Sequence, residues 1–139
     1  MAKYKLDISV DYNFDLIGIA AHLSDYRLCW FLNEQLQLRL HKSEAPFYVS
    51  DKNGNISGSF SMYEWLDEDN FRNFFLLKNK SDGQFLFPEL PKIDYFLVIQ
   101  EAGSIDIDDF LTQMKEIKPI LAVFNLDVAT FSSSKKLIF

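Results

Sequence analysis

The spacing of apolar positions changes several times along the chain, and each change predicts a new element. Alternation of apolar and polar side chains over residues 4–9 predicts a strand with one buried face. Apolar side chains then recur at helical spacing over 14–23, behind the N-cap candidates Asp11 and Asn13. The sequence therefore predicts a strand followed by a first helix.

A second helix is predicted over 25–36, with Ser24 and Asp25 as its cap. Its inner stripe would consist of Leu28, Phe31, Leu32 and Leu36. Every second residue from 26 to 32 is also apolar, which fits a strand. The helix is the preferred interpretation because residues 33–35 contain no turn of the Asn-Gly type.

The middle of the chain changes to the two-residue period of strands. Extended segments are predicted over 36–41, 46–49, 59–66 and 71–77. Asn53-Gly54 is a hairpin turn signal, and the acidic residues 67–70 form a second turn. Residues 78–84 are predicted to be a polar loop.

The last third of the chain predicts a buried strand, a helix and a return strand. The strand covers the continuous apolar run 96–99, and the helix begins behind Asp106 and Asp108. The return strand covers 120–124, before a loop-like tail. Together these elements predict one α+β domain over 1–139: a two-layer fold with a mostly antiparallel sheet and two or three helices on one face.

Composition narrows the classes of function. Fourteen Lys and Arg against 20 Asp and Glu give a net charge of −6, which disfavours nucleic acid as a partner. A single cysteine, no signal peptide and no long apolar run predict a cytoplasmic protein without a membrane span. His22 and His41 lie far apart and no Gly-rich phosphate motif occurs, so no metal and no cofactor are predicted.

The most distinctive segment is 87–95, Phe-Pro-Glu-Leu-Pro-Lys-Ile-Asp-Tyr. It resembles the motif of the IPExxxVDY family of small bacterial proteins, with Phe87 and Ile93 as apolar replacements. Four residues match in identity: Pro88, Glu89, Asp94 and Tyr95. Residues 12–19 and 25–28 are also similar to that family. The resemblance implies a family whose function is unassigned, and it transfers no catalytic residues.

The motif has a chemical and a structural interpretation. Glu89 and Asp94 are candidates for acid–base work, with Tyr95 and Arg27 completing a binding site. The structural interpretation is preferred: the two carboxylates accept hydrogen bonds from loop N–H groups, or Asp94 pairs with Arg27 or Arg39. The P-x-x-P spacing that Pro88 begins is a polyproline ligand in one interpretation and a stiff connection in the preferred one.

The two strands over 59–66 and 71–77 carry aromatic residues on both faces of a predicted hairpin. The candidate interface residues are Trp65, Phe71, Phe74 and Phe75. Two explanations stay open for the second face: a partner covers it, or the helices or the C-terminal residues 137–139 do.

The leading hypothesis is a non-enzymatic protein–protein interaction or accessory module that uses the aromatic hairpin or a sheet edge. Its partner would be another protein or a second copy. The alternative is a small-molecule-binding protein or enzyme with its site around the Pro-Glu-x-x-x-x-Asp-Tyr motif.

Overall fold

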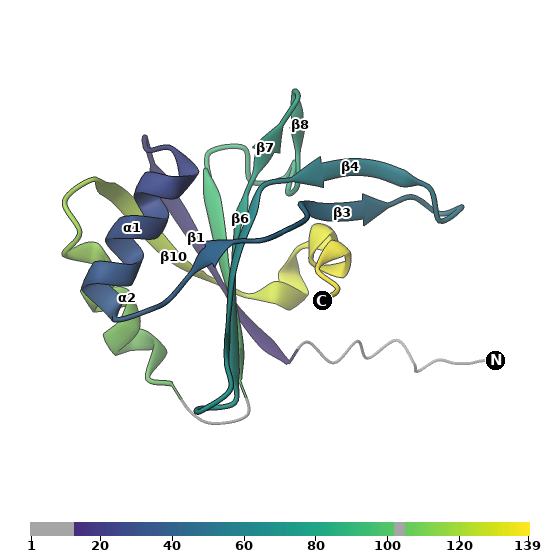
Figure 1. Ribbon diagram of the computed structural model, residues 1–139. Helices are drawn as coiled ribbons and strands as arrows, with labels where there is room; N and C mark the ends of the chain where they lie inside the picture. Colours follow the sequence, from purple (N-terminus) through teal and green to yellow (C-terminus); the bar gives the residue numbers. More distant parts are fainter. Residues whose placement is uncertain (1–12, 102–104) are drawn as a thin grey trace.

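The computed structural model describes residues 13–101 and 105–139 (Figure 1). It has the predicted α+β fold, in which two helices pack on one face of a mostly antiparallel sheet. The six strands of the main sheet have the order β10-β1-β9-β6-β5-β2. Their bounds are β1 (Phe14–Ala21), β2 (His41–Lys42), β5 (Met62–Asp67), β6 (Arg72–Lys78), β9 (Tyr95–Glu101) and β10 (Ile120–Leu126).

Two short hairpins and four helical segments complete the described chain. The hairpins pair β3 (Phe47–Ser50) with β4 (Ile56–Phe60), and β7 (Lys80–Ser81) with β8 (Gln84–Phe85). The helices are α1 (Asp25–Leu36) and α2 (Ile107–Lys115), and the 3-10 turns are η2 (Val128–Thr130) and η3 (Ser132–Lys136). The strand predicted over 4–9 lies outside the described residues.

The helix predicted over 14–23 is wrong, because this segment forms β1 near the centre of the sheet. β1 pairs with β9 along one edge and with β10 along the other, and its side chains enter a separate core on each face of the sheet. Leu16, Ile17 and Ile19 are all fully buried. A continuous apolar run of this kind fits a buried strand as well as a buried helix, and periodicity alone does not separate them.

Gly18 of β1 allows close packing on the face opposite the helices. A Cβ placed there would lie 3.1 Å from Leu126 Cδ1 and 3.2 Å from Ile93 Cδ1. The missing side chain therefore lets β10 and the loop that contains Ile93 approach the centre of β1.

Both helices agree with the sequence prediction. α1 covers the predicted residues, and α2 begins where the Asp106 side chain accepts a hydrogen bond from Asp109 N at 3.1 Å. The strand predicted over 36–41 is reduced to β2. The side chain of Asn33 explains the difference. Its Oδ1 accepts a hydrogen bond from Leu40 N at 2.9 Å, and its Nδ2 donates to Leu40 O at 3.0 Å. These backbone groups are therefore not available to pair with a neighbouring strand.

The hairpins also follow the predicted turns. Asp51 Oδ1 accepts hydrogen bonds from Asn53 N and Asn55 N and so closes the turn between β3 and β4. β5 and β6 pair across the acidic turn. The polar loop predicted over 78–84 instead contains β7 and β8, which turn at Asp82-Gly83, where both residues have positive φ.

The face of the sheet opposite the helices is covered by the chain itself. Phe75 of β6 and Phe96 of β9 point into this second core. Phe47, Leu86, Phe87 and Leu137 pack on it. The ring of Phe139 stacks on Phe75 with centroids 4.1 Å apart, and the C-terminal turns lie on this side (yellow in Figure 1). The C-terminal residues therefore help to cover the second face of the aromatic hairpin.

Candidate functional site

The motif forms a loop, residues 86–94, that is fastened by one buried side chain outside it. Asn79 is fully buried at the end of β6. Its Nδ2 donates to Leu90 O at 3.0 Å and Ile93 O at 2.8 Å, and its Oδ1 accepts from Phe87 N at 2.8 Å. Sequence analysis missed Asn79, because an asparagine in a polar stretch carries no signal of burial. We call residues 86–94 the motif loop.

Glu89 fixes the motif loop to the C-terminal turns. Its carboxylate accepts hydrogen bonds from Ser133 Oγ at 2.6 Å, from Ser133 N at 3.0 Å and from Ser132 Oγ at 3.4 Å. Burial alone would raise the pKa of Glu89, but these hydrogen bonds outweigh burial and hold the pKa below its ordinary value. A carboxyl group that is stabilised as the anion is a poor general acid at neutral pH.

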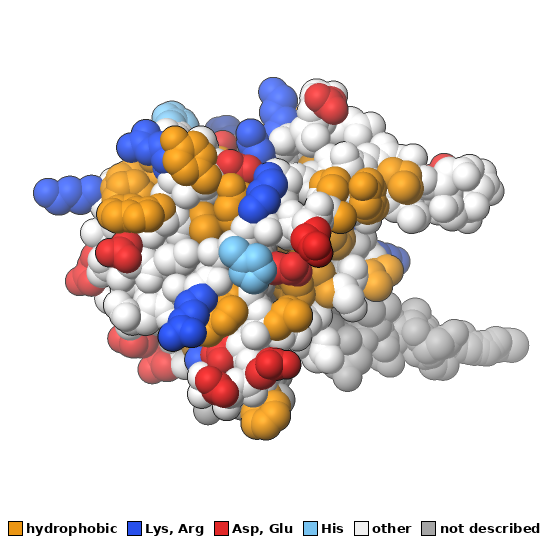
Figure 2. All heavy atoms as spheres, viewed as in Figure 1, with side chains coloured by type: hydrophobic (Ala, Val, Ile, Leu, Met, Phe, Trp, Pro, Cys, Tyr) orange, Lys and Arg blue, Asp and Glu red, His pale blue; other side chains and the backbone are white. Residues whose placement is uncertain are grey.

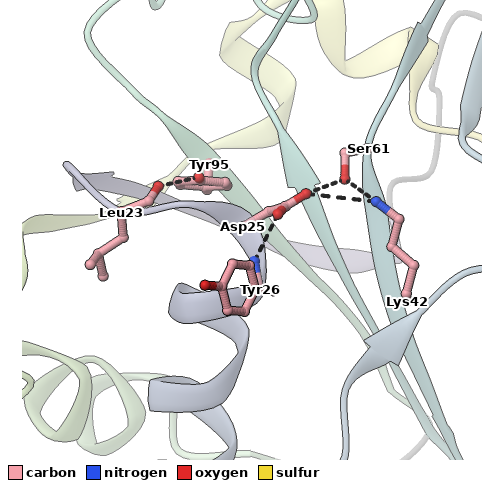
Figure 3. A network of polar contacts seen from close by, with 6 residues as sticks. All are labelled: Leu23, Asp25, Tyr26, Lys42, Ser61 and Tyr95. Atoms are coloured by element: carbon pink, nitrogen blue, oxygen red, sulfur yellow. Dashed lines mark hydrogen bonds and ion pairs between the residues drawn. The ribbon is translucent and has the colours of Figure 1, made fainter.

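Asp94 and Tyr95 fix the other end of the motif loop to the segment between β1 and α1. Asp94 Oδ2 accepts a hydrogen bond from Ala21 N at 2.9 Å. The Tyr95 hydroxyl donates to Leu23 O (Figure 3). Burial and then the charges of Asp25 and Asp94 raise the pKa of Tyr95 to about 12, so the hydroxyl stays a donor.

The structure does not unite the five motif candidates into one site. Arg27 is exposed on α1, and in the described residues no hydrogen bond or ion pair joins it to Asp94. Pro88 is exposed in the motif loop. Glu89 bonds the C-terminal turns, whereas Asp94 bonds the segment after β1. The two carboxylates thus serve separate structural contacts.

A polar network lies beside Tyr95 (Figure 3). Asp25 accepts hydrogen bonds from Ser61 Oγ at 2.6 Å and Tyr26 N at 2.7 Å, and Lys42 Nζ lies 3.7 Å from its Oδ2. Burial would raise the pKa of Asp25, but these hydrogen bonds and the charges of Lys42 and Lys78 lower it. The network joins the start of α1 to Ser61, which precedes β5, and to Lys42 of β2.

A groove of about 440 Å³ adjoins this network. Its polar lining residues are His22, Lys78, Lys80, Asp94 and the hydroxyl-bearing Tyr95. Figure 2 shows Lys and Arg side chains at this upper end of the molecule, near β7 and the start of α1. The groove therefore combines lysine ammonium groups with one carboxylate in a chain whose net charge is −6.

The aromatic hairpin contributes little to the surface. Phe74 and Phe75 have exposed fractions of 1% and 6%, so both lie in the core. Trp65 is half-buried and stacks on Phe74 with ring centroids 5.3 Å apart. Among the four candidate interface residues only Phe71, at the tip of the hairpin, is well exposed.

The outer edge of β10 is a long open edge of the sheet. β10 is an outermost strand, and within residues 13–101 and 105–139 no strand pairs with its outer side. Its sequence, Ile-Leu-Ala-Val-Phe-Asn-Leu, has no charge and no proline. Leu121 and Phe124 are 63% and 45% exposed. β2, at the opposite edge, has only two residues, His41 and Lys42.

An apolar pocket of about 330 Å³ lies next to this edge. Phe124 and Leu126 of β10 form one wall, and the motif loop forms the other with Leu90, Pro91 and Ile93. The hydrogen bonds of four side chains, those of Asn79, Glu89, Asp94 and Tyr95, hold this second wall in place. We call the outer edge of β10 and this pocket the edge site.

Sequence analysis named a sheet edge as a possible binding surface, but it did not locate that edge. No helix in the described part of the chain is long and apolar enough to cross a bilayer. In the same residues, no three His, Cys, Asp or Glu side chains converge as metal ligands would.

Comparisons with known proteins add no relative. No protein-family model, no curated protein and no solved structure matches the chain. The resemblance to the IPExxxVDY family therefore stays a prediction from the motif residues.

Proposed function

We propose that this protein is a non-enzymatic interaction module that binds another polypeptide as an added strand on β10. The observation that carries the proposal is the uncharged outermost strand, whose outer side pairs with no strand of the described chain. Every second residue of such a strand directs its N–H and C=O groups outward, and an extended partner can pair with them.

The contrast between the two edges of the sheet supports the proposal. Natural sheets guard their edges with short strands, lysine or proline, which discourage pairing with other chains. β2 has two of these features, because it is short and contains Lys42. β10 has seven residues and none of the protective side chains. An edge left open in this way is suited to binding.

The pocket of the edge site supports the same function. Side chains of an added strand alternate between the two faces of the sheet. One row would lie on the face of Phe124 and Leu126, where a large apolar side chain could enter the pocket. Main-chain pairing then supplies affinity, and the pocket supplies selectivity. The motif loop acts as the rigid wall of this pocket.

The edge can be tested by comparing two lysine substitutions. The wild-type protein, Phe124→Lys and Phe71→Lys are immobilised, and proteins retained from a cell lysate are quantified and cross-linked to the bait. Phe124 is at the edge site, whereas Phe71 is exposed at the tip of the β5–β6 hairpin. We expect the wild-type and Phe71→Lys baits to retain a protein that cross-links to β10. The Phe124→Lys bait should not retain this protein. Retention that is equal for all three baits would contradict the proposal, as would retention by none.

A second candidate function is the binding of a small anion in the groove beside Asp94 and Tyr95. It is favoured by Lys78 and Lys80, which line the groove in an otherwise acidic chain. Titration with inorganic phosphate, followed by amide chemical shifts, tests it. Support for this function would be saturable shifts of amides at the groove that disappear in Lys80→Ala. The control is Lys52→Ala, in the exposed β3–β4 turn, which should keep these shifts. Unsaturable or absent shifts would reject it.

A further inference from the structure

We infer that the strand that pairs with β10 is β10 of a second copy, which runs antiparallel to it. This inference rests on the proposed function, since it requires the edge of β10 to accept a strand. A two-fold axis perpendicular to the sheet would relate the copies and keep both pairs of helices on the same face. The two six-stranded sheets would then continue into each other.

The sequence of β10 is compatible with pairing to itself. With Val123 at the centre, Ala122 faces Phe124 of the second copy, and this regular alternation ends at Leu121, where the register of β10 with β1 shifts. No charged residues meet along the strand, because β10 has none. A small residue opposite a large one leaves space for the half-exposed Phe124 ring, which gains cover from the second copy.

The charges that flank β10 select the antiparallel orientation. Lys118 precedes the strand and Asp127 follows it, and both are exposed. Antiparallel pairing centred on Val123 brings the turn that contains Lys118 of each copy to the same end of the interface as Asp127 of the other. Parallel pairing would instead bring Lys118 beside Lys118 and Asp127 beside Asp127. Charge complementarity therefore favours a closed two-fold dimer.

The interface is short, so the dimer should form reversibly with concentration. A strand of seven residues extends over roughly 23 Å. A single ladder of this length, with Phe124 and its neighbours, buries less than the roughly 1,200 Å² typical of stable complexes. The negative net charge of each copy also opposes association.

Sedimentation velocity of the full chain over a wide range of concentrations tests this inference. The wild-type protein should change from one chain to two as concentration rises. Lys118→Asp and Asp127→Lys should each weaken the dimer about tenfold, because each creates like charges at both ends of the interface. The double variant should recover wild-type association, since it restores opposite charges in the reversed arrangement. Far-ultraviolet circular dichroism checks that all variants are folded.

Two further variants locate the interface. Phe124→Lys should prevent dimerisation, and the control Phe71→Lys should leave it unchanged. A wild type that is monomeric at every concentration would overturn the inference, as would a dimer that neither single charge reversal weakens. If the wild type is monomeric, but retains a lysate protein that the Phe124→Lys variant does not retain, the inference fails and the proposed function stands. If Phe124→Lys changes neither measurement, both fail.

Discussion

Asn79 is the residue on which the conformation of the motif loop depends most. Its side chain uses both amide hydrogens and the amide oxygen on backbone groups of the loop, and all of this lies out of solvent. No other single side chain in the described residues hydrogen-bonds to three backbone positions of the loop. Asn79 therefore determines the wall of the edge site although it does not line the pocket.

Replacing Asn79 should be strongly destabilising. Asn79→Ala removes the side-chain partner of Phe87 N and Ile93 O, whereas Leu90 O keeps its hydrogen bond from Ile93 N, and buried unpaired groups of this kind cost about 3 kcal/mol in sum. Urea denaturation measures the free energy of unfolding. Gln35→Ala, on the exposed side of α1, is the control and should change it by less than about 0.5 kcal/mol. Equal stability of the two variants would contradict the role of Asn79.

Glu89 makes the free energy of unfolding vary with pH in the acidic range. Its pKa in the folded protein lies below the ordinary value of 4.5, because hydrogen bonds to the carboxylate outweigh burial. The stabilisation is therefore present above pH 4.5 and is lost as pH falls through the folded pKa.

Glu89→Gln tests this dependence. At about pH 7 the variant should be less stable than wild type by less than about 1 kcal/mol, because the carboxylate is partly exposed. The difference should become smaller at about pH 3 than at pH 7, because lowering the pH below 4.5 and through the folded pKa protonates the wild-type carboxyl. Urea denaturation at both pH values provides the measurement. A difference that is the same at both would show that the charge of Glu89 does not matter.

Elements whose signals are local could be predicted from the sequence. α1 and α2 carry helical periodicity and acidic residues in their first turns, and the β3–β4 turn carries Asn53-Gly54. β1 could not be predicted in this way. Its edges pair with strands that lie about eighty and one hundred residues later in the chain, and its two faces are covered by cores that residues 14–21 do not reveal.

The candidate site shows the same limit. Sequence analysis selected the correct segment for the motif loop, because its prolines and acids are distinctive. It placed Phe74 and Phe75 among interface residues, whereas both are buried. Their burial depends on β9, on the helices and on Phe139, all distant in sequence. Likewise, the apolar pattern of β10 predicts a strand, but only the strand order places it at an edge.

At the scale of the whole molecule, the sheet is covered on both faces and differs at its two edges. The helices cover one face, and the motif loop, β3, β4 and the C-terminal turns pack on the other. β2 ends the sheet with two residues, whereas β10 ends it with seven. The longer of the two outermost strands in the described sheet is therefore β10.

The C-terminal residues should contribute measurably to stability because they close the second core. Leu137 has an exposed fraction of 6% within that core, so Leu137→Ala should lower the free energy of unfolding by about 2–3 kcal/mol. Ile138, its neighbour, is 79% exposed, and Ile138→Ala should have an effect below about 0.5 kcal/mol. Thermal denaturation compares the two. A cost for Leu137→Ala as small as that for Ile138→Ala would contradict the packing of the tail.

The central claim is that the outer edge of β10 is open and receives a strand. Amide hydrogen exchange in β10 tests this claim most directly. In dilute protein, alternate residues of Ile120–Leu126 should be protected by their bonds to β1, and the outward amides between them should exchange fast. At high concentration the outward amides should become protected as well, and Phe124→Lys should prevent this change. Uniform protection of all seven residues at every dilution would show that the edge is already covered, and would contradict the account.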